Sequence, residues 1–226
     1  MNKTSLPRTV AAGSLVATAV LSLASNVTAP EFPSGAEDRL AAIDDGGSLA
    51  VLSAMTFTLA QLFLTAGILG AAALVHRRRP VLAYLAAGMV VAGTFGHSVF
   101  GGINLVMLEM ARDVDQRATY AGLLSDVESG PAMVFMAIGL LGTVLGFLVL
   151  AIGMWRSRAV ALWIPAALAG FVVVEFVGAG ISEWAGYAAG VLYVAALSGT
   201  ALAIACSDVW SAVDRSDTRN GVLARD

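Results

Sequence analysis

Apolar runs that match the thickness of a lipid bilayer are the feature that most limits how this chain can fold. A helix needs about 20 apolar residues to cross hydrocarbon. Only 13% of the residues are charged, against about a quarter in soluble domains. Charged and turn-forming residues separate six such runs, at 9–25, 48–75, 81–108, 131–154, 159–181 and 185–206. The sequence therefore predicts an all-α, polytopic transmembrane bundle over 1–207, followed by a polar cytoplasmic tail at 208–226.

Basic residues lie mostly on one side of the predicted bundle. That side holds Lys3, Arg8, Arg77, Arg78, Arg79, Arg156, Arg158, Arg215, Arg219 and Arg225. Only Arg39, Arg112 and Arg117 fall on the other side, which is rich in Asp and Glu. Because Lys and Arg are retained in the cytoplasm during insertion, both termini are expected inside. The near absence of lysine among many arginines indicates a GC-rich bacterial genome, and hence the inner (plasma) membrane.

The first apolar run allows two interpretations. Its basic start, its short Ala-rich core and the small residues before Ala29 are also features of a cleaved signal peptide. Pro30 directly after that position disfavours cleavage, so we expect a retained helix and six spans. Cleavage would leave five spans in the same orientation.

Two connections on the exterior side, 26–47 and 109–130, are long enough to hold helices. In the first, Ser34 and Glu37 have the spacing of a capping box, which predicts a short helix ending at Gly46. The second predicts a helix on the outer rim of the bundle. The apolar face of that helix would carry Tyr120, Leu123, Leu124 and Val127.

The stretch GTFGHSVFGG places a histidine and a serine among glycines, as in the nucleophile turn of serine hydrolases. That turn requires Gly-x-Ser-x-Gly, but the second glycine after Gly96 and Ser98 comes one position late. His97 and Ser98 also point about 100 degrees apart on a helix. The chain has no His-Glu-x-x-His motif either. We therefore expect no enzymatic activity.

Cofactor, metal and nucleic-acid sites are not expected either. A membrane b-type haem takes two axial histidines from facing helices, and only His97 lies deep within a predicted span. The exterior connections have no calcium-loop spacing and no basic and aromatic cluster for nucleic acid. The lipid bilayer is the partner that the composition predicts.

Small residues recur at helical spacing in three predicted spans. In the third span they form a stripe with two polar residues, and the fourth and sixth spans repeat the small-xxx-small pattern. The positions are Gly93, His97, Gly101 and Asn104, then Gly142 and Gly146, then Gly186 and Gly190. Such seams draw transmembrane helices together, and they can also join a membrane-protein partner or a second copy of the chain.

Two ionisable residues lie well inside the predicted spans. At about 1.5 Å per residue, His97 lies about 16 Å and Glu175 about 9 Å from the exterior ends. Such groups are costly in hydrocarbon and usually face the bundle interior. Further polar residues at comparable depth, or on the same face, complete a candidate cluster: Gln61, Asn104, Thr58 and Ser182.

This candidate cluster has a functional and a structural interpretation. In the first, Glu175 accepts a proton or a cation with His97 as its partner. In the second, the side chains hydrogen-bond across helices, each worth about 0.6 to 2 kcal/mol. The functional case predicts that Glu175 and His97 face a wettable cavity, and the structural case predicts a dry seam.

The sequence therefore leaves two classes of function. We expect a non-catalytic accessory, sensor or assembly protein, because no motif demands more. The alternative is a proton- or cation-coupled transporter or channel for a small solute that uses the polar cluster.

Overall fold

The structure is a computed structural model that describes residues 5–178 and 184–207. Regular structure within these residues is entirely helical, as predicted. Of the described helices, five are long and apolar enough to cross a membrane, which fits a helical membrane bundle. They are α1 (Ser5–Thr28), α2 (Ala36–His76), α3 (Pro80–Arg112), α5 (Ala132–Ser157) and α7 (Ala185–Ala205). The shorter elements are η1 (Val114–Gln116), α4 (Arg117–Ser129) and α6 (Trp163–Phe176).

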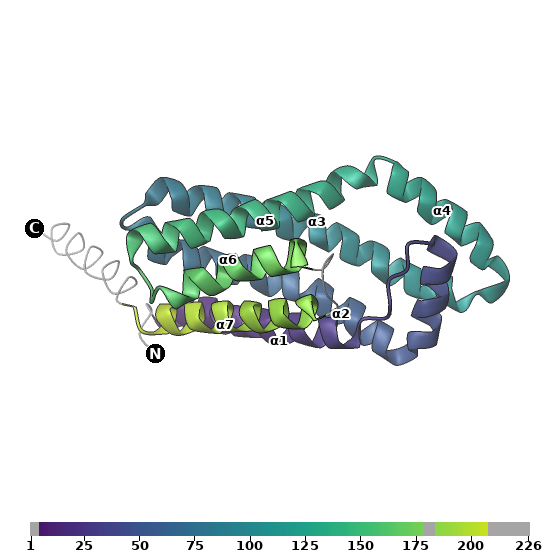
Figure 1. Cartoon of the computed structure of the whole chain (residues 1–226), viewed down its shortest axis with the longest axis horizontal. Helices are drawn as coiled ribbons and strands as arrows, with labels where there is room; N and C mark the ends of the chain where they lie inside the picture. The colour runs from purple at the N-terminus through teal and green to yellow at the C-terminus, as the bar shows by residue number, and fades with distance from the viewer. Residues whose placement is uncertain (1–4, 179–183, 208–226) are drawn as a thin grey trace, which may run out of the picture.

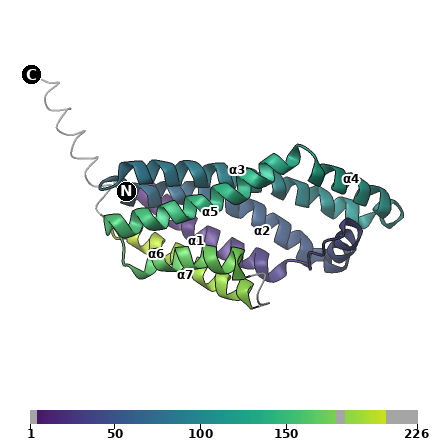
Figure 2. The same cartoon turned by 45° about the horizontal axis from the view of Figure 1, so that its top comes forward.

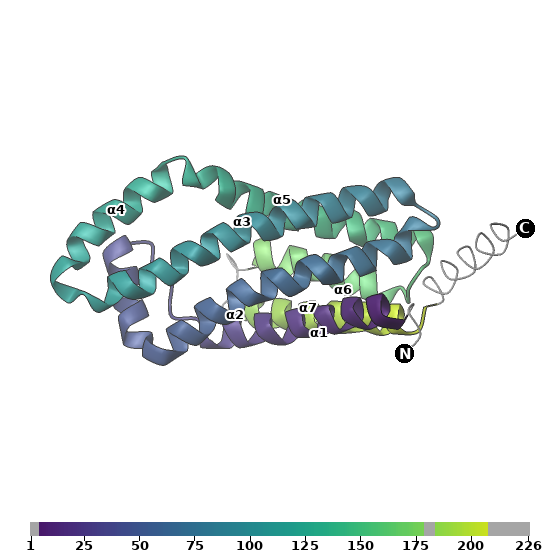
Figure 3. The same cartoon turned by 180° about the vertical axis from the view of Figure 1, so that it is seen from behind.

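The long helices run alongside one another (Figure 1). α3 packs on α5, α1 packs on α2 and α7, and α6 lies between α5 and α7 (Figure 2). Seen from behind, α2 lies between α1 and α3 (Figure 3). The start of α1, the end of α7 and the loop at 77–79 lie at one end of the bundle, termed the terminal end. The opposite end, termed the α4 end, is formed by 29–47 and 113–131.

Three clusters of apolar side chains pack within the described residues: one at the α4 end, around Leu40 and Met107, and two along the bundle. In the central cluster, Val90 of α3, Phe147 of α5 and Leu168 of α6 are each at most 1% exposed. Nearer the terminal end, Leu15 of α1 and Ile204 of α7 are fully buried in the second cluster. Lipid is as apolar as these side chains, so van der Waals packing rather than exclusion of water favours their contacts. α1 is therefore packed as a member of the bundle.

α6 is the main departure from the predicted spans. The fifth predicted span covers 159–181, but α6 is a helix of 14 residues. Residues 179–181 lie outside the described part. At about 1.5 Å per residue, α6 is about 21 Å long, whereas the hydrocarbon core is about 30 Å thick. α6 begins at the terminal end, alongside α7, and ends inside the bundle (Figure 1).

The helices at the α4 end extend further than predicted. α1 continues to Thr28 and α3 to Arg112, so the predicted connections 26–47 and 109–130 begin inside helices. The reason is that hydropathy detects the apolar part of a helix, and a helix can continue through polar residues outside hydrocarbon. By contrast, α7 agrees with its predicted span to within one residue at its end.

The start of α2 also differs from the prediction. The capping box of Ser34 and Glu37 is wrong, because Gly35 is the N-cap and no side chain caps the helix. With Gly35 as N-cap, Asp38 rather than Glu37 occupies the third helical position. Asp38 folds back over the cap, where a Cβ added to Gly35 would lie 2.9 Å from its Oδ2.

A break at Gly47 divides α2 into a short part at the α4 end and a long part. Gly47 has φ 50° and ψ −123°, a backbone conformation that favours glycine. The short helix predicted to end at Gly46 is thus present as the first part of α2.

α4 is the predicted rim helix and forms an arc over the α4 end (Figure 1). Of its predicted apolar face, Leu124 is buried, and Tyr120 and Val127 are half-buried. The prediction is wrong for Leu123, which is 49% exposed. Consecutive residues point about 100° apart on a helix, so Leu123 and Leu124 cannot both face inward.

Ion pairs close the α4 end. Arg39 of α2, whose side chain is 7% exposed, binds the Glu128 carboxylate of α4 through two nitrogens, with Nη2 3.2 Å from Oε2. The Arg39 guanidinium also lies 4.7 Å from the ring centre of Phe32. Arg117 reaches Asp44 at 2.8 Å. Two of the carboxylates predicted on the exterior loops, Glu128 and Asp44, therefore hold α2 and α4 together.

Glycines bring α3 and α5 into backbone contact. A Cβ added to Gly93 would lie 2.6 Å from the backbone N of Thr143, and one added to Gly142 would lie 2.7 Å from the Met89 carbonyl oxygen. Gly96 faces the backbone of Gly139. We term this contact between α3 and α5 the glycine seam.

The other predicted seams differ in how closely they are packed. Gly146 continues the glycine seam, because a Cβ there would lie 2.8 Å from the backbone N of Val90. On α7, a Cβ on Gly186 would meet nothing within 4 Å, and one on Gly190 would meet Asn26 Nδ2 at 3.8 Å. The α7 pair is therefore not used for close packing within the described chain.

Candidate functional site

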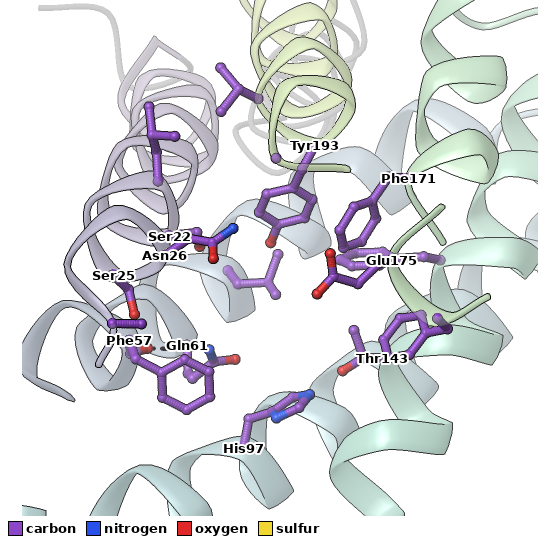
Figure 4. A pocket seen from close by; sticks show the side chains of 17 residues that line it. Ser22, Ser25, Asn26, Phe57, Gln61, His97, Thr143, Phe171, Glu175 and Tyr193 are labelled. Carbon is purple, nitrogen blue, oxygen red and sulfur yellow. Dashed lines mark hydrogen bonds between the residues drawn. The ribbon is translucent and has the colours of Figure 1, made fainter. Parts of the chain in front are cut away.

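A pocket of about 300 Å³ lies among α1, α2, α3, α5, α6 and α7, and each of these helices contributes to its wall (Figure 4). We term it the polar pocket. It lies where α1 and α6 end and α7 begins. Its polar lining residues are Ser22, Ser25, Asn26, Gln61, His97, Thr143, Glu175 and Tyr193. Three of the six residues of the predicted cluster, Gln61, His97 and Glu175, are therefore brought together here.

Glu175 and His97 reach the pocket from different helices. Glu175 lies in the last turn of α6, and its carboxylate points into the pocket. His97 points into the same space from α3 (Figure 4). No hydrogen bond joins either side chain to another of the pocket residues drawn. The two ionisable groups thus line a cavity and are not bonded to each other across a dry seam.

The His97 ring is held by its neighbours on two sides. The Phe57 ring meets it edge-on, with the ring centres 5.8 Å apart and an interplanar angle of 87°. On α5, a Cβ added to Gly139 would lie 3.1 Å from the His97 backbone N and 3.5 Å from its Nδ1. A glycine at 139 therefore leaves room for the α3 backbone at His97, while the imidazole itself lies at ordinary van der Waals distance.

Two buried oxygen atoms of the pocket lining have no hydrogen-bond partner. Gln61 is 7% exposed; its Nε2 donates to the Phe57 carbonyl at 3.2 Å, while its Oε1 is unpartnered. Thr143 is 8% exposed, and its Oγ1 is also unpartnered. Leaving a buried polar group unsatisfied costs about 1–3 kcal/mol. A structural network would satisfy these atoms, whereas a binding site uses them for a ligand.

Aromatic side chains form one wall of the polar pocket. Tyr193 of α7 packs against Phe171 of α6 with ring centres 4.6 Å apart, and against Phe147 of α5 at 6.0 Å. The Tyr193 hydroxyl points into the pocket on the side of Ser22 (Figure 4). This wall gives the pocket an apolar surface beside its polar groups.

Several pocket residues were missed by the sequence analysis. Ser22 and Asn26 fall where the first span was expected to end, and Thr143 follows Gly142 of the predicted seam but was not itself singled out. Tyr193 carried a usable signal, because it is the one tyrosine of the sequence in the interior of a predicted span. The others had no signal beyond the polar character of their side chains.

The remaining residues of the predicted cluster lie elsewhere. Thr58 does not line the polar pocket; its Oγ1 donates to the Ala54 carbonyl at 2.9 Å, and it packs against Gly101. Asn104 lies two turns from His97, about 10 Å along α3, and lines a second pocket toward the α4 end. Ser182 lies outside the described residues. Equal depth in the membrane did not bring these side chains to one place.

The polar pocket is better suited to accepting hydrogen bonds than to holding a metal ion. Among the described residues, no group of three His, Cys, Asp or Glu side chains gathers to hold a metal ion. The arrangement combines one carboxylate, two unpartnered oxygens, one imidazole and an aromatic wall. These groups can bind a small solute that carries a positive charge and hydrogen-bond donors.

Comparisons of the chain with protein-family models, with curated proteins and with solved structures gave no match.

Proposed function

We propose that this protein is a non-catalytic sensor or accessory protein of the inner (plasma) membrane that binds a small primary ammonium group in the polar pocket. The observation that carries the proposal is the pair of unpartnered oxygens, Gln61 Oε1 and Thr143 Oγ1, around the same cavity as the Glu175 carboxylate. A primary ammonium has three N–H donors and one positive charge. Its donors match these three acceptors, and its charge offsets that of a carboxylate inside the membrane.

His97 and Tyr193 have separate roles in this proposal. The His97 ring, held beside Phe57 and Gly139, supplies a polar side to the pocket opposite α6. The Tyr193 ring offers an aromatic face, which attracts a cation at close range. Neither side chain replaces the carboxylate, so binding depends most on Glu175.

The proposed orientation places the α4 end outside and both termini in the cytoplasm, with α1 retained. The distribution of basic residues supports this orientation, because six of the described arginines lie at the terminal end and only three at the α4 end, each of these three bound to a carboxylate. The pairs are Arg39–Glu128, Arg112–Glu109 and Arg117–Asp44. At the terminal end, Arg78 instead donates to the Ser157 carbonyl at 2.6 Å, where α5 ends.

Exposed aromatic residues support a membrane position that buries the polar pocket. Trp155 and Trp163 are 60% and 53% exposed near the terminal end, and Tyr187 is 68% exposed near the start of α7. Trp and Tyr are enriched at the two interfaces of a membrane. Counting about 1.5 Å per residue from Trp163 places Glu175 about 18 Å above the inner interface. The proposed site thus lies in the outward half of a bilayer with a core of about 30 Å.

Transport is the second candidate function, and the length of α6 favours it. Helices that end inside the bilayer are typical of transporters, where the C-terminal ends of half-helices coordinate cations. α6 has 14 residues and carries Glu175 in its last turn. Uptake of methylammonium into proteoliposomes, compared with empty liposomes, tests this candidate. An uptake rate that is unchanged by Glu175→Gln would remove it.

The binding proposal is tested with methylammonium chloride as the probe. The unfolding temperature of the protein in lipid nanodiscs is measured at constant ionic strength, with sodium chloride, which has no N–H donor, as the balancing salt. We expect the unfolding temperature to rise with methylammonium concentration. Glu175→Gln should abolish the rise, while the control Glu109→Gln, at an exposed rim position, should retain it. A wild-type protein that does not respond, or an equal response of Glu175→Gln, would overturn the proposal.

A further inference from the structure

A second pocket of about 370 Å³ adjoins the polar pocket on the side of the α4 end. The two pockets share three lining residues: Ser25 of α1, Ala29 directly after α1, and Phe57 of α2. The Phe57 ring meets His97 on the polar side and Phe100, with ring centres 6.2 Å apart, on the other. Phe57 is therefore the common wall of the two pockets.

The chemistry of this second pocket is different. Nine of its twelve lining residues are apolar, including Phe32, Ile43 and Leu108, and they carry no formal charge. Two of its three polar residues satisfy each other, since Ser25 and Ser53 exchange hydrogen bonds at 3.1 and 2.9 Å. We term it the apolar pocket. It suits the hydrocarbon part of a ligand.

One polar atom of the apolar pocket remains without a partner. The Oδ1 of Asn104 is buried and, among the described lining residues of this pocket, it is the one buried side-chain oxygen without a hydrogen bond. An amide oxygen accepts a hydrogen bond from a hydroxyl or an N–H group. A ligand that fills this pocket therefore gains one polar contact at its far end.

We infer that the ligand is an amphiphilic primary amine whose ammonium group binds at Glu175 and whose apolar tail passes Phe57 into the apolar pocket. A hydroxyl or amide at the end of the tail reaches Asn104. Each pocket has a volume at the lower end of the range for small-molecule sites, about 300–1,000 Å³, and together they accommodate a head and a tail. The inference rests on the proposed function and adds the class of ligand.

The test is a series of n-alkylammonium chlorides from methyl to hexyl, with dissociation constants measured by calorimetry on the full chain in lipid nanodiscs. The n-alcohols of equal length serve as controls for partition into lipid. We expect the affinity for the ammonium series to rise up to about fourfold per methylene group, the value for burial of one CH₂. The alcohols should bind more weakly than the ammonium salts of equal length, because they lack the charge that Glu175 binds.

Two phenylalanine variants locate the tail. Phe32 lines the apolar pocket and is 56% exposed, so Phe32→Ala should fold. This variant should reduce the gain in affinity for each added methylene group. Phe95, 58% exposed, lines neither pocket, and Phe95→Ala should leave the gain unchanged.

The outcomes separate this inference from the proposed function. An affinity that depends on Glu175 but not on chain length, or a gain per methylene unchanged by Phe32→Ala, would overturn the inference and leave the proposed function intact. Methylammonium that fails to bind would overturn both.

Discussion

The two sides of α3 meet their neighbours in opposite ways. Toward α5, Gly96 removes its side chain from the contact, and the two backbones touch in the glycine seam. Toward α2 and α6, the adjacent residue His97 points into the polar pocket. One stretch of helix thus supplies both the closest packing of the bundle and part of its cavity. The comparison teaches that the glycines position α3 firmly and leave the adjacent side free for a ligand.

The largest expected effect is at the glycine seam. Gly96→Ala places a Cβ against the backbone of Gly139 and the Phe135 carbonyl, neither of which can move as a flexible side chain can. Overpacking of this kind costs about 1–3 kcal/mol. Gly102→Ala on the same helix is the matched control, because a Cβ there meets nothing within 4 Å. It should be neutral or stabilising by about 0.5–1 kcal/mol.

The free energy of unfolding of both glycine variants is measured by reversible unfolding in mixed micelles. Equal stability of Gly96→Ala and Gly102→Ala would show that α3 and α5 are not in backbone contact, and the comparison would fail.

A smaller effect on stability is expected when a hydrogen-bonded threonine, Thr94, is compared with an unpartnered one, Thr143. Thr94 Oγ1 lies 2.9 Å from Thr65 Oγ1, and it also donates to the Val91 carbonyl at 2.9 Å. Thr94→Val leaves Thr65 with one partner fewer and should cost about 1 kcal/mol. Thr143→Val removes a buried oxygen without a partner, so it should leave the protein at least as stable while weakening methylammonium binding.

The same unfolding assay and the methylammonium titration decide this pair of variants. If Thr143→Val were the more destabilising of the two, its hydroxyl would be part of a structural network instead of the site.

The sequence predicted the helical bundle well because apolar length is a direct requirement of the bilayer. The starts of α3 at Pro80 and of α5 after Pro131 are encoded by proline, which loses no hydrogen bond at a helix start. α6 could not be predicted in the same way. The apolar run at 159–181 is long enough to span, and only tertiary structure determines that the helix within it has 14 residues.

The candidate site was predicted in part, for a related reason. Depth follows from counting along a helix, so His97, Glu175 and Gln61 could be placed at similar levels. Direction around each helix axis depends on how the helix packs, which explains why Thr58 faces Gly101 while Phe57 and Gln61 face the pocket. Asn104 shares a stripe with His97 but lies two turns away, beside the apolar pocket.

The capping-box prediction failed because the helix starts one residue later than expected, with Gly35 instead of Ser34 as the N-cap. Gly35 can serve as an N-cap without a side chain, and Asp38 then takes the third helical position. Such a shift by one residue is local, and it changes neither the span that follows nor the site.

The most direct test of the account is whether water reaches the polar pocket and not the packed contact between α2 and α3, where Thr94 meets Thr65. Gln61→Cys and Thr94→Cys are compared in a Cys206→Ser background, since Cys206 is exposed and would react. Both positions are buried, at 7% and 2% exposure. A positively charged methanethiosulfonate reagent should modify Gln61→Cys, with protection by methylammonium, and should leave Thr94→Cys unmodified. Equal rates at the two positions, or a Gln61→Cys that does not react, would contradict a solute-accessible pocket.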